Sequence, residues 1–134
     1  MHIFSKNIMK VLLAIPSLSK LDGGPTNILI GWAQALSRQG IHVDVVTTNA
    51  CGNGYADVPL AKWLEEGGYR IQYFPALNVE GYKWSFSLAK WFFKHIKDYN
   101  LVHTCAIFSL PNIPAHWACR YHHVPYVMTP HGML

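Results

Sequence analysis

The first third of the chain alternates between strand-like and helix-like patterns. Residues 10–15 are apolar almost throughout, which is typical of a strand covered on both faces of a parallel sheet. From Pro25 to Arg38 apolar residues recur at helical spacing, and Gly40 follows as a C-terminal stop. Residues 42–48 are rich in β-branched side chains and predict a second strand. A strand, a helix and a strand in this order form a βαβ unit, which has parallel strands and a right-handed crossover.

The rest of the chain continues the same alternation. The further predicted strands are residues 69–74, 101–104 and 124–129. Helices are expected over residues 85–98, with Ser85 or Ser87 as the cap, and over residues 109–121. The residues of the second helix expected to face the core are Ile113, Trp117 and Ala118.

Three connecting segments have weaker patterns. A short helix is expected over residues 58–66, closed by Gly67 and Gly68. Residues 49–57 and 76–84 are expected to be irregular because they are polar or interrupted by glycine.

Five strands alternating with helices predict an α/β protein with an open, doubly wound, mostly parallel sheet. The expected strand order is 3-2-1-4-5. Residues 1–134 are enough for one domain and too few for two ordinary ones. In such a sheet a covering helix normally follows the fifth strand, so we expect a C-terminally incomplete domain from a truncated or partial reading frame.

The composition is that of a folded protein, and it argues against nucleic acid as a partner. The chain is 51% hydrophobic and has a formal net charge of +4, without the dense Lys/Arg clusters of a nucleic-acid reader. Three widely spaced cysteines show no metal-ligand spacing, so we expect reduced packing residues, no metal and a cytoplasmic location. No apolar segment is long enough to span a bilayer.

Two adjacent glycines, Gly23 and Gly24, lie between the first strand and the helix that begins at Pro25. Glycine lets a backbone approach a ligand closely, and a helix N-terminus attracts phosphate. The pair fits neither the dinucleotide fingerprint nor a P-loop. For the pair taken alone, a loop that needs positive φ angles is the preferred explanation.

Ligands of open α/β sheets bind beyond the carboxyl ends of the strands. With the expected strand order, the loop containing Gly23 and Gly24 meets residues 105–109 and the pair His131–Gly132 at one edge. His131 can donate to a sugar hydroxyl or a phosphate oxygen, and Gly132 gives a ligand access to the backbone. A strand-end histidine bonded to a backbone carbonyl is the alternative for His131.

Other histidines and one helix have simpler interpretations. We expect His103 to be packed inside a strand, and His42 and His116 to lie at the surface or at helix ends. Residues 83–97 combine lysines with aromatic side chains, which suggests a peripheral contact with the inner face of a membrane. An ordinary helix that covers the sheet is the preferred interpretation of this segment.

Six segments also occur together in a characteristic order and spacing. They are residues 10–17 (KVLLAIPS), 23–26 (GGPT), 32–40 (WAQALSRQG), 43–47 (VDVVT), 101–103 (LVH) and 125–134 (PYVMTPHGML). In this combination the chain resembles the N-terminal, acceptor-side domain of a GT-B glycosyltransferase of family 4. The resemblance covers nearly the whole chain.

The resemblance implies a retaining enzyme that transfers a sugar from a nucleotide-sugar donor to a glycan or lipid-linked acceptor, in polysaccharide or glycolipid biosynthesis. Gly23 and Gly24 would line the cleft near the donor diphosphate, His131 would contact the transferred sugar, and Gly132 would shape the turn beside it. No cofactor or metal is implied. The C-terminal donor-binding domain would have to come from a further segment or a partner chain, so the isolated chain is expected to be inactive.

Two other classes of protein remain open at this point. One is a non-catalytic accessory or interaction subunit built on half of a GT-B fold. The other is an unrelated Rossmann-type nucleotide-binding domain. The lack of a G-x-G-x-x-G sequence counts against the second of these alternatives.

Overall fold

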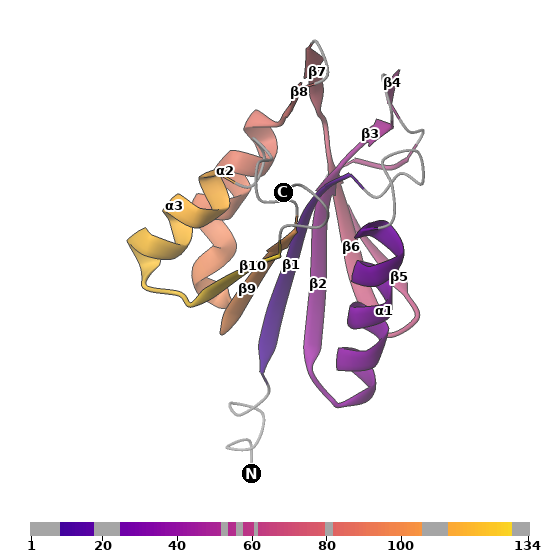
Figure 1. The fold of residues 1–134 in the computed structure, drawn as a ribbon, viewed down its shortest axis with the longest axis vertical. Coiled ribbons are helices and arrows are strands. Elements are labelled where there is room, and N and C mark those ends of the chain that lie inside the picture. Colours follow the sequence, from indigo (N-terminus) through magenta and orange to yellow (C-terminus); the bar gives the residue numbers. More distant parts are fainter. Residues whose placement is uncertain are drawn as a thin grey trace.

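The computed structural model describes residues 9–17, 25–51, 54–55, 58–60, 62–79, 82–105 and 113–129. A six-stranded sheet forms the middle of the molecule (Figure 1). In sheet order its strands are β10 (Tyr126–Thr129), β9 (Leu101–Cys105), β1 (Lys10–Ser17), β2 (His42–Thr48), β6 (Tyr69–Phe74) and β5 (Trp63–Glu66). The chain therefore has a mixed α/β fold, as the sequence predicted.

The expected strand order is confirmed. The five predicted strands correspond to β6, β2, β1, β9 and β10, and each neighbouring pair among them is parallel. In the middle of the sheet Leu12 pairs with Asp44 on one side and with Val102 on the other. Strand β5 adds an antiparallel edge to this parallel sheet.

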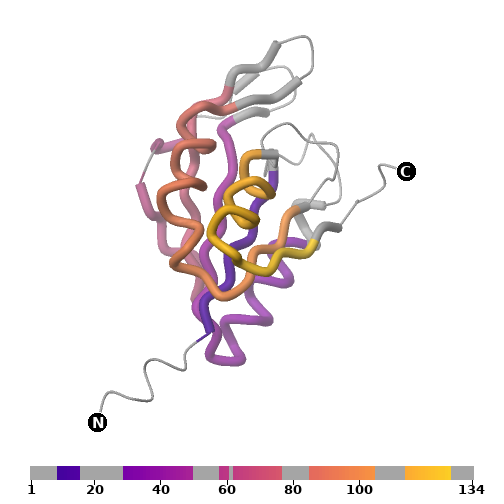
Figure 2. Tube along the Cα trace, turned by 90° about the vertical axis from the view of Figure 1, so that its left-hand side faces the viewer, coloured from indigo at the N-terminus to yellow at the C-terminus, as the bar shows by residue number. Residues whose placement is uncertain are grey.

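Helices cover both faces of the sheet. Helix α1 (Pro25–Arg38) packs on one face, where Leu29 and Ala33 meet the buried side chains of β1 and β2. Helices α2 (Phe86–His95) and α3 (Ile113–His122) lie side by side on the other face (Figure 2). A 3-10 turn, η3 (Ile96–Asp98), continues α2. The sheet is thus the middle layer of three, which is the doubly wound arrangement.

Local sequence explains the ends of two helices. Gly40 has φ +81°, a left-handed conformation that ends α1 at low steric cost. The Oγ of Ser85 accepts a hydrogen bond of 3.2 Å from the Leu88 N–H, so Ser85, and not Ser87, is the cap of α2. Leu88 and Phe92 are buried, which confirms that this helix covers the sheet.

The predicted short helix over residues 58–66 is wrong. Residues 63–66 are instead β5, which returns antiparallel to β6 through Gly67 and Gly68. These glycines have φ angles of +33° and +100°, and two positive values in succession favour a tight hairpin. A Cβ on Gly68 would lie 2.9 Å from the Oγ of Ser37, so the hairpin also packs closely on α1.

Two segments predicted to be irregular contain short antiparallel pairs. Strands β3 (Ala50–Cys51) and β4 (Gly54–Tyr55) pair with each other, and so do β7 (Leu77–Val79) and β8 (Tyr82–Trp84). Each hairpin is separate from the main sheet. Pairs of two or three residues are too short to leave a clear alternating pattern in the sequence.

One expected core residue of α3 is at the surface. Trp117 is 64% exposed, whereas Ala115, Ala118 and Cys119 are buried against the sheet. The small residues bring α3 close to the sheet and leave no room for an indole. Burial raises the pKa of the Cys119 thiol to about 12, which fits the predicted role of this cysteine in packing.

Candidate functional site

The carboxyl ends of β1, β9 and β10 lie next to one another at one edge of the sheet (Figure 1). Thr104 pairs with Ala14 of β1 and with Met128 of β10, and Cys105 pairs with Thr129. The three strands therefore reach this edge in register. The segments that follow them, residues 18–24, 106–112 and 130–134, are outside the described part of the chain.

The same edge is the point where the strand order reverses. From β1 the chain passes through α1 to β2 on one side, whereas β9 and β10 lie on the other side of β1. In open α/β sheets, ligands bind in the crevice at such a point. Helices α1 and α3 begin here, on opposite faces of the sheet (Figure 1). Their N-termini contribute partial positive charge, which favours an anionic ligand.

The four residues that the sequence singled out are all beyond the described ranges. Gly23 and Gly24 precede α1, and His131 and Gly132 follow β10. The described ends of β1, β9 and β10 lie at a common edge, as the predicted strand order required. The individual roles of these four residues stay predictions.

A histidine for which the sequence predicts a place at the surface or at a helix end lies beneath this edge. His116, in the first half of α3, is half-buried, and its Nε2 lies 2.9 Å from the Oγ1 of Thr104. Its ring stacks on Tyr126 with the ring centroids 5.0 Å apart. Burial lowers the pKa of His116, so the neutral form is favoured. Together these contacts fix α3 to β9 and β10 just below the candidate site.

On the opposite face of the sheet, a second histidine, in β9, makes a comparable ring contact with a helix. The imidazole of His103 stacks on Trp32 of α1 with the ring centroids 4.7 Å apart. His103 is therefore packed, as predicted, and it ties α1 to β9. Each of the two helices that begin at the candidate site is thus held to β9 by a histidine contact.

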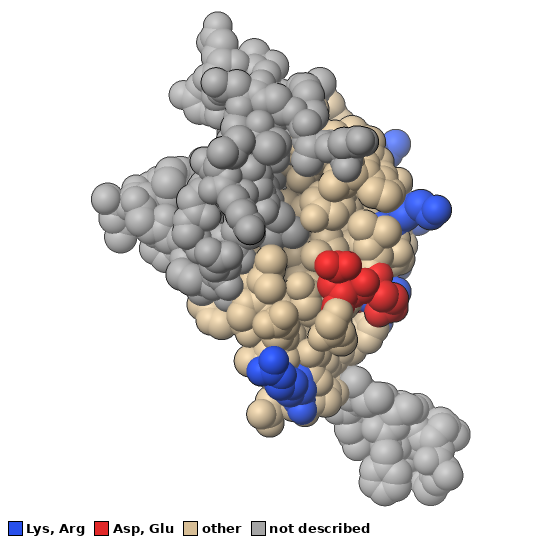
Figure 3. Space-filling view, turned by 90° about the vertical axis from the view of Figure 1, so that its right-hand side faces the viewer, with Lys and Arg blue, Asp and Glu red and all other residues tan. Residues whose placement is uncertain are grey.

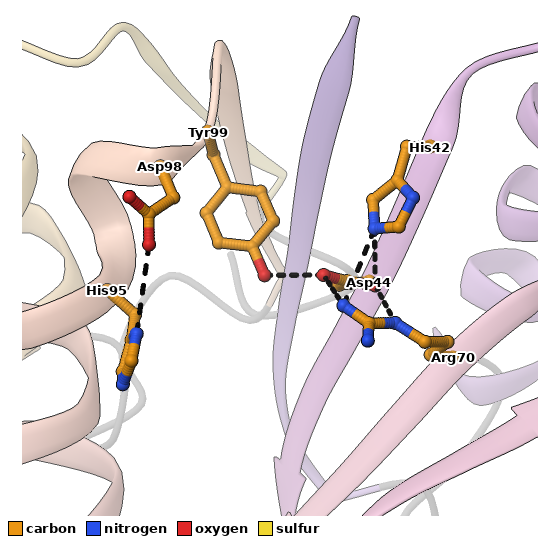
Figure 4. A network of polar contacts seen from close by, with 6 residues as sticks. All are labelled: His42, Asp44, Arg70, His95, Asp98 and Tyr99. Atoms are coloured by element: carbon orange, nitrogen blue, oxygen red, sulfur yellow. Dashed lines mark hydrogen bonds and ion pairs between the residues drawn. The ribbon is translucent and has the colours of Figure 1, made fainter. Parts of the chain in front are cut away.

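A second group of polar residues lies at the amino edge of the strands, away from this site (Figure 4). Asp44 is fully buried, and its carboxylate accepts from Arg70 Nε and Nη2 at 2.8 Å each and from the Tyr99 hydroxyl at 2.6 Å. The Nε2 of His42 lies 3.1 Å from the same carboxylate. The partners come from β2, β6 and the segment after η3, so Asp44 joins the sheet to the α2 layer.

The charge of Asp44 is well compensated. Burial alone would raise the pKa of this carboxyl, but hydrogen bonds from Arg70 and Tyr99 and the nearby positive charges outweigh burial and lower it. Asp44 is therefore ionised at neutral pH. Sequence reasoning missed this group, although a lone aspartate inside an apolar strand is itself a signal that a buried partner exists.

The fold defines the class of protein: an open α/β domain of the kind that binds its ligand at the switch point of the sheet. The family model of Glycosyltransferase Family 4 matches residues 22–134. The chain belongs to this family. Neither the curated proteins nor the solved structures that were compared contain a match.

Two searches of the described residues gave no candidates. No described helix is long and apolar enough to cross a membrane. Within the same ranges, no group of three or more His, Cys, Asp and Glu side chains is arranged to hold a metal ion.

Proposed function

We propose that this chain is the acceptor-side domain of a retaining glycosyltransferase. The enzyme transfers a sugar from a nucleotide-sugar donor to a glycan or lipid-linked acceptor, in polysaccharide or glycolipid biosynthesis. The observation that carries the proposal is the family match over residues 22–134. The adjacent ends of β1, β9 and β10 at the switch point support it, because they form the edge where a ligand of such a sheet binds.

The chemistry of the transfer suits this edge. The bond between the anomeric carbon and the donor diphosphate breaks and negative charge develops on the departing diphosphate. A bond from the anomeric carbon to the acceptor oxygen forms, and the proton of the acceptor hydroxyl passes to the diphosphate. Backbone N–H groups near Gly23 and Gly24, at the start of α1, are suited to stabilise that charge. His131 contacts the transferred sugar and Gly132 shapes the turn beside it. In this proposal the charge is balanced by protein groups, without a metal or another cofactor.

The proposal includes a second domain that binds the nucleotide, either in the same polypeptide or in a partner chain. We place the enzyme in the cytoplasm, with a peripheral contact at the inner face of the membrane. Phe86 and Phe93 of α2 are exposed, and Lys90 and Lys94 lie on the same helix. Exposed aromatic side chains beside lysines suit a membrane surface with anionic lipids. The described basic side chains on the face drawn in Figure 3 lie in small separate groups, and the proposal includes no nucleic acid as a partner.

A transfer assay with the complete gene product tests the proposal. The protein is incubated with a panel of radiolabelled nucleotide-sugars and a membrane lipid extract, and the label in the lipid and polymer fractions is counted. We expect transfer from one donor. The His131→Ala variant is expected to lower turnover at least about a hundredfold, as is typical when a group that contacts the reacting centre is removed.

The control variant is His123→Asn, at an exposed position whose φ of +58° asparagine tolerates. It is expected to leave turnover unchanged. Near-normal turnover of His131→Ala would remove His131 from the site. A failure of the complete gene product with every donor would contradict the enzyme proposal and favour the accessory subunit.

A further inference from the structure

A cavity of about 380 Å³ opens at the amino edge of the parallel strands, beside the buried Asp44. Its lining residues are Lys10, Asp44, Trp63, Arg70, Gln72, Trp91, His95, Asp98 and Tyr99. Its volume falls within the range of about 300–1,000 Å³ that is usual for sites of small ligands. The glycosyl-transfer site lies at the opposite, carboxyl edge, so this cavity has no role in the proposed reaction.

Three of the nine lining side chains are aromatic, and the others are polar or charged. Trp91 of α2 lies at the centre, with ring centroids 6.0 Å from Trp63 and 6.2 Å from Tyr99. The guanidinium carbon of Arg70 lies 4.1 Å from the ring centroid of Trp63. Trp63 and Trp91 are only half-buried, so parts of both rings remain available to a ligand. Flat aromatic surfaces of this kind suit the C–H faces of a sugar ring.

Two polar members of the wall, Arg70 and Tyr99, are held in place by Asp44. Arg70 and Tyr99 both bond to the carboxylate of Asp44, so their positions are fixed before any ligand arrives (Figure 4). A preformed wall lowers the entropic cost of binding.

One polar group of the lining has no partner. Gln72 is only 7% exposed, and within the described part of the chain its Oε1 forms no hydrogen bond. An unpaired buried acceptor is costly, by about 1–3 kcal/mol, and such groups call for an explanation. Oε1 is itself buried in this structure, and because the terminal torsion of glutamine has a broad energy profile, a rotation of the amide would be enough to turn it toward the cavity. A ligand hydroxyl would then supply the missing donor.

The charges of the lining select against ions. The positive charges of Lys10 and Arg70 are balanced by the negative charges of Asp44 and Asp98. A phosphate or a nucleotide therefore finds no net attraction here. Aromatic faces, an unpaired amide oxygen and balanced charge together suit an uncharged ligand that has many hydroxyl groups.

We propose that this cavity, lined by Trp63, Gln72 and Trp91, is a second carbohydrate site that binds one uncharged sugar unit of a glycan. The site is separate from the transfer edge and holds a glycan without reacting with it. A glycan held there raises the local concentration of its ends at the protein surface.

Fluorine NMR of the complete gene product labelled with 5-fluorotryptophan tests the proposal. The signals of Trp63, Trp91 and Trp117 are assigned by single substitution to Phe. Methyl α-glucoside, methyl α-galactoside, methyl α-mannoside and the disaccharide cellobiose are titrated in turn. We expect at least one of them to shift the Trp63 and Trp91 signals saturably. Trp117, exposed on α3, is the internal control and is expected not to move.

Two variants locate the binding. Gln72→Met removes the amide oxygen and is expected to weaken binding at least about fivefold, while the control Glu65→Gln, at an exposed position of β5 outside the cavity lining, is expected to keep the wild-type affinity. Both variants must give the wild-type circular dichroism spectrum, which shows that they fold. Sugar transfer to a short acceptor is expected to be unchanged in both, so this test is independent of the enzyme proposal.

The proposal would be overturned by three results. The first is the absence of a saturable shift with all four sugars up to about 50 mM, well above the millimolar affinity of a weak site. The second is a shift of Trp63 and Trp91 with inorganic phosphate and with none of the sugars, which would make the cavity an anion site. The third is unchanged sugar affinity in Gln72→Met.

Discussion

Arg70 donates two hydrogen bonds of 2.8 Å to Asp44, from Nε to Oδ1 and from Nη2 to Oδ2. The pair joins adjacent strands, β2 and β6, in register. Asp44 is fully buried, whereas the side chain of Arg70 is about one-third exposed. The two-pronged geometry fixes the position of the guanidinium as well as its charge. It therefore determines both the packing of the α2 layer and the shape of the cavity beside it.

Removal of the arginine is expected to leave an uncompensated charge in the interior. Arg70→Met is predicted to lower the free energy of unfolding by about 3 kcal/mol, because a buried pair that loses one member keeps the desolvation cost of the other. Urea denaturation followed by circular dichroism measures the change. The control Glu65→Gln, at an exposed position of β5, is expected to stay within about 0.5 kcal/mol of the wild type. A similar small effect of Arg70→Met would show that Asp44 does not depend on this partner.

Acid is expected to weaken the same pair. The pKa of Asp44 is below its ordinary value of 3.8 in the folded protein, so the unfolded chain binds the proton more readily. The stabilisation is therefore fully present above about pH 4 and is lost as the pH falls below that value. Urea midpoints of the wild type and of Asp44→Asn are expected to converge as the pH is lowered from 6 to 3. A constant difference over this range would contradict the assignment.

His116 is expected to make the stability of the fold depend on pH in a second, higher pH range. Burial lowers its pKa below the ordinary value of 6.5, so the unfolded chain binds the proton more tightly. The associated stability is complete above about pH 6.5 and declines as the pH falls further. His116→Gln is expected to remove this component, whereas His123→Asn keeps it. Thermal midpoints of both variants between pH 7.5 and 5 measure the difference.

Two glycines are expected to respond oppositely to the same substitution. Gly68→Ala is predicted to destabilise the fold by about 1–3 kcal/mol, since its φ of +100° strains any side chain and the added Cβ would meet Ser37. Gly31→Ala, within α1 and with no atom within 4 Å of the added Cβ, is predicted to stabilise it by up to about 1 kcal/mol. Denaturant midpoints compare the two. A stabilising Gly68→Ala would contradict the tight hairpin between β5 and β6.

The strand order was predictable because it follows from general rules. Alternating strands and helices, right-handed crossovers and a helix beginning at Pro25 lead to the observed sheet, in which the carboxyl ends of β1, β9 and β10 share one edge. The resemblance to family 4 was also visible in the sequence, and the family match confirms it.

Features that depend on distant residues were not predictable in the same way. Arg70 is 26 positions from Asp44 in the sequence, and Tyr99 is 55 positions from it. No local sequence pattern therefore predicts that these side chains bond to Asp44. The segment from residue 58 was assigned as a helix because its polar and apolar residues fit either period, and the pairing with β6 decided the outcome. Trp117 was placed in the core on hydrophobicity alone, whereas the close approach of α3 to the sheet excludes it.

The central position of β1 has a consequence for the way the protein is made. Val11 pairs with Val43 on one side and with Leu101 on the other. As the chain leaves the ribosome, β1, β2, β5 and β6 are complete long before β9 has been synthesised. During that interval one side of β1 presents an unpaired strand edge whose residues 11–16 are all apolar, the kind of surface that recruits foreign strands. The speed of translation between residues 75 and 105 therefore sets how long the nascent protein is exposed to aggregation.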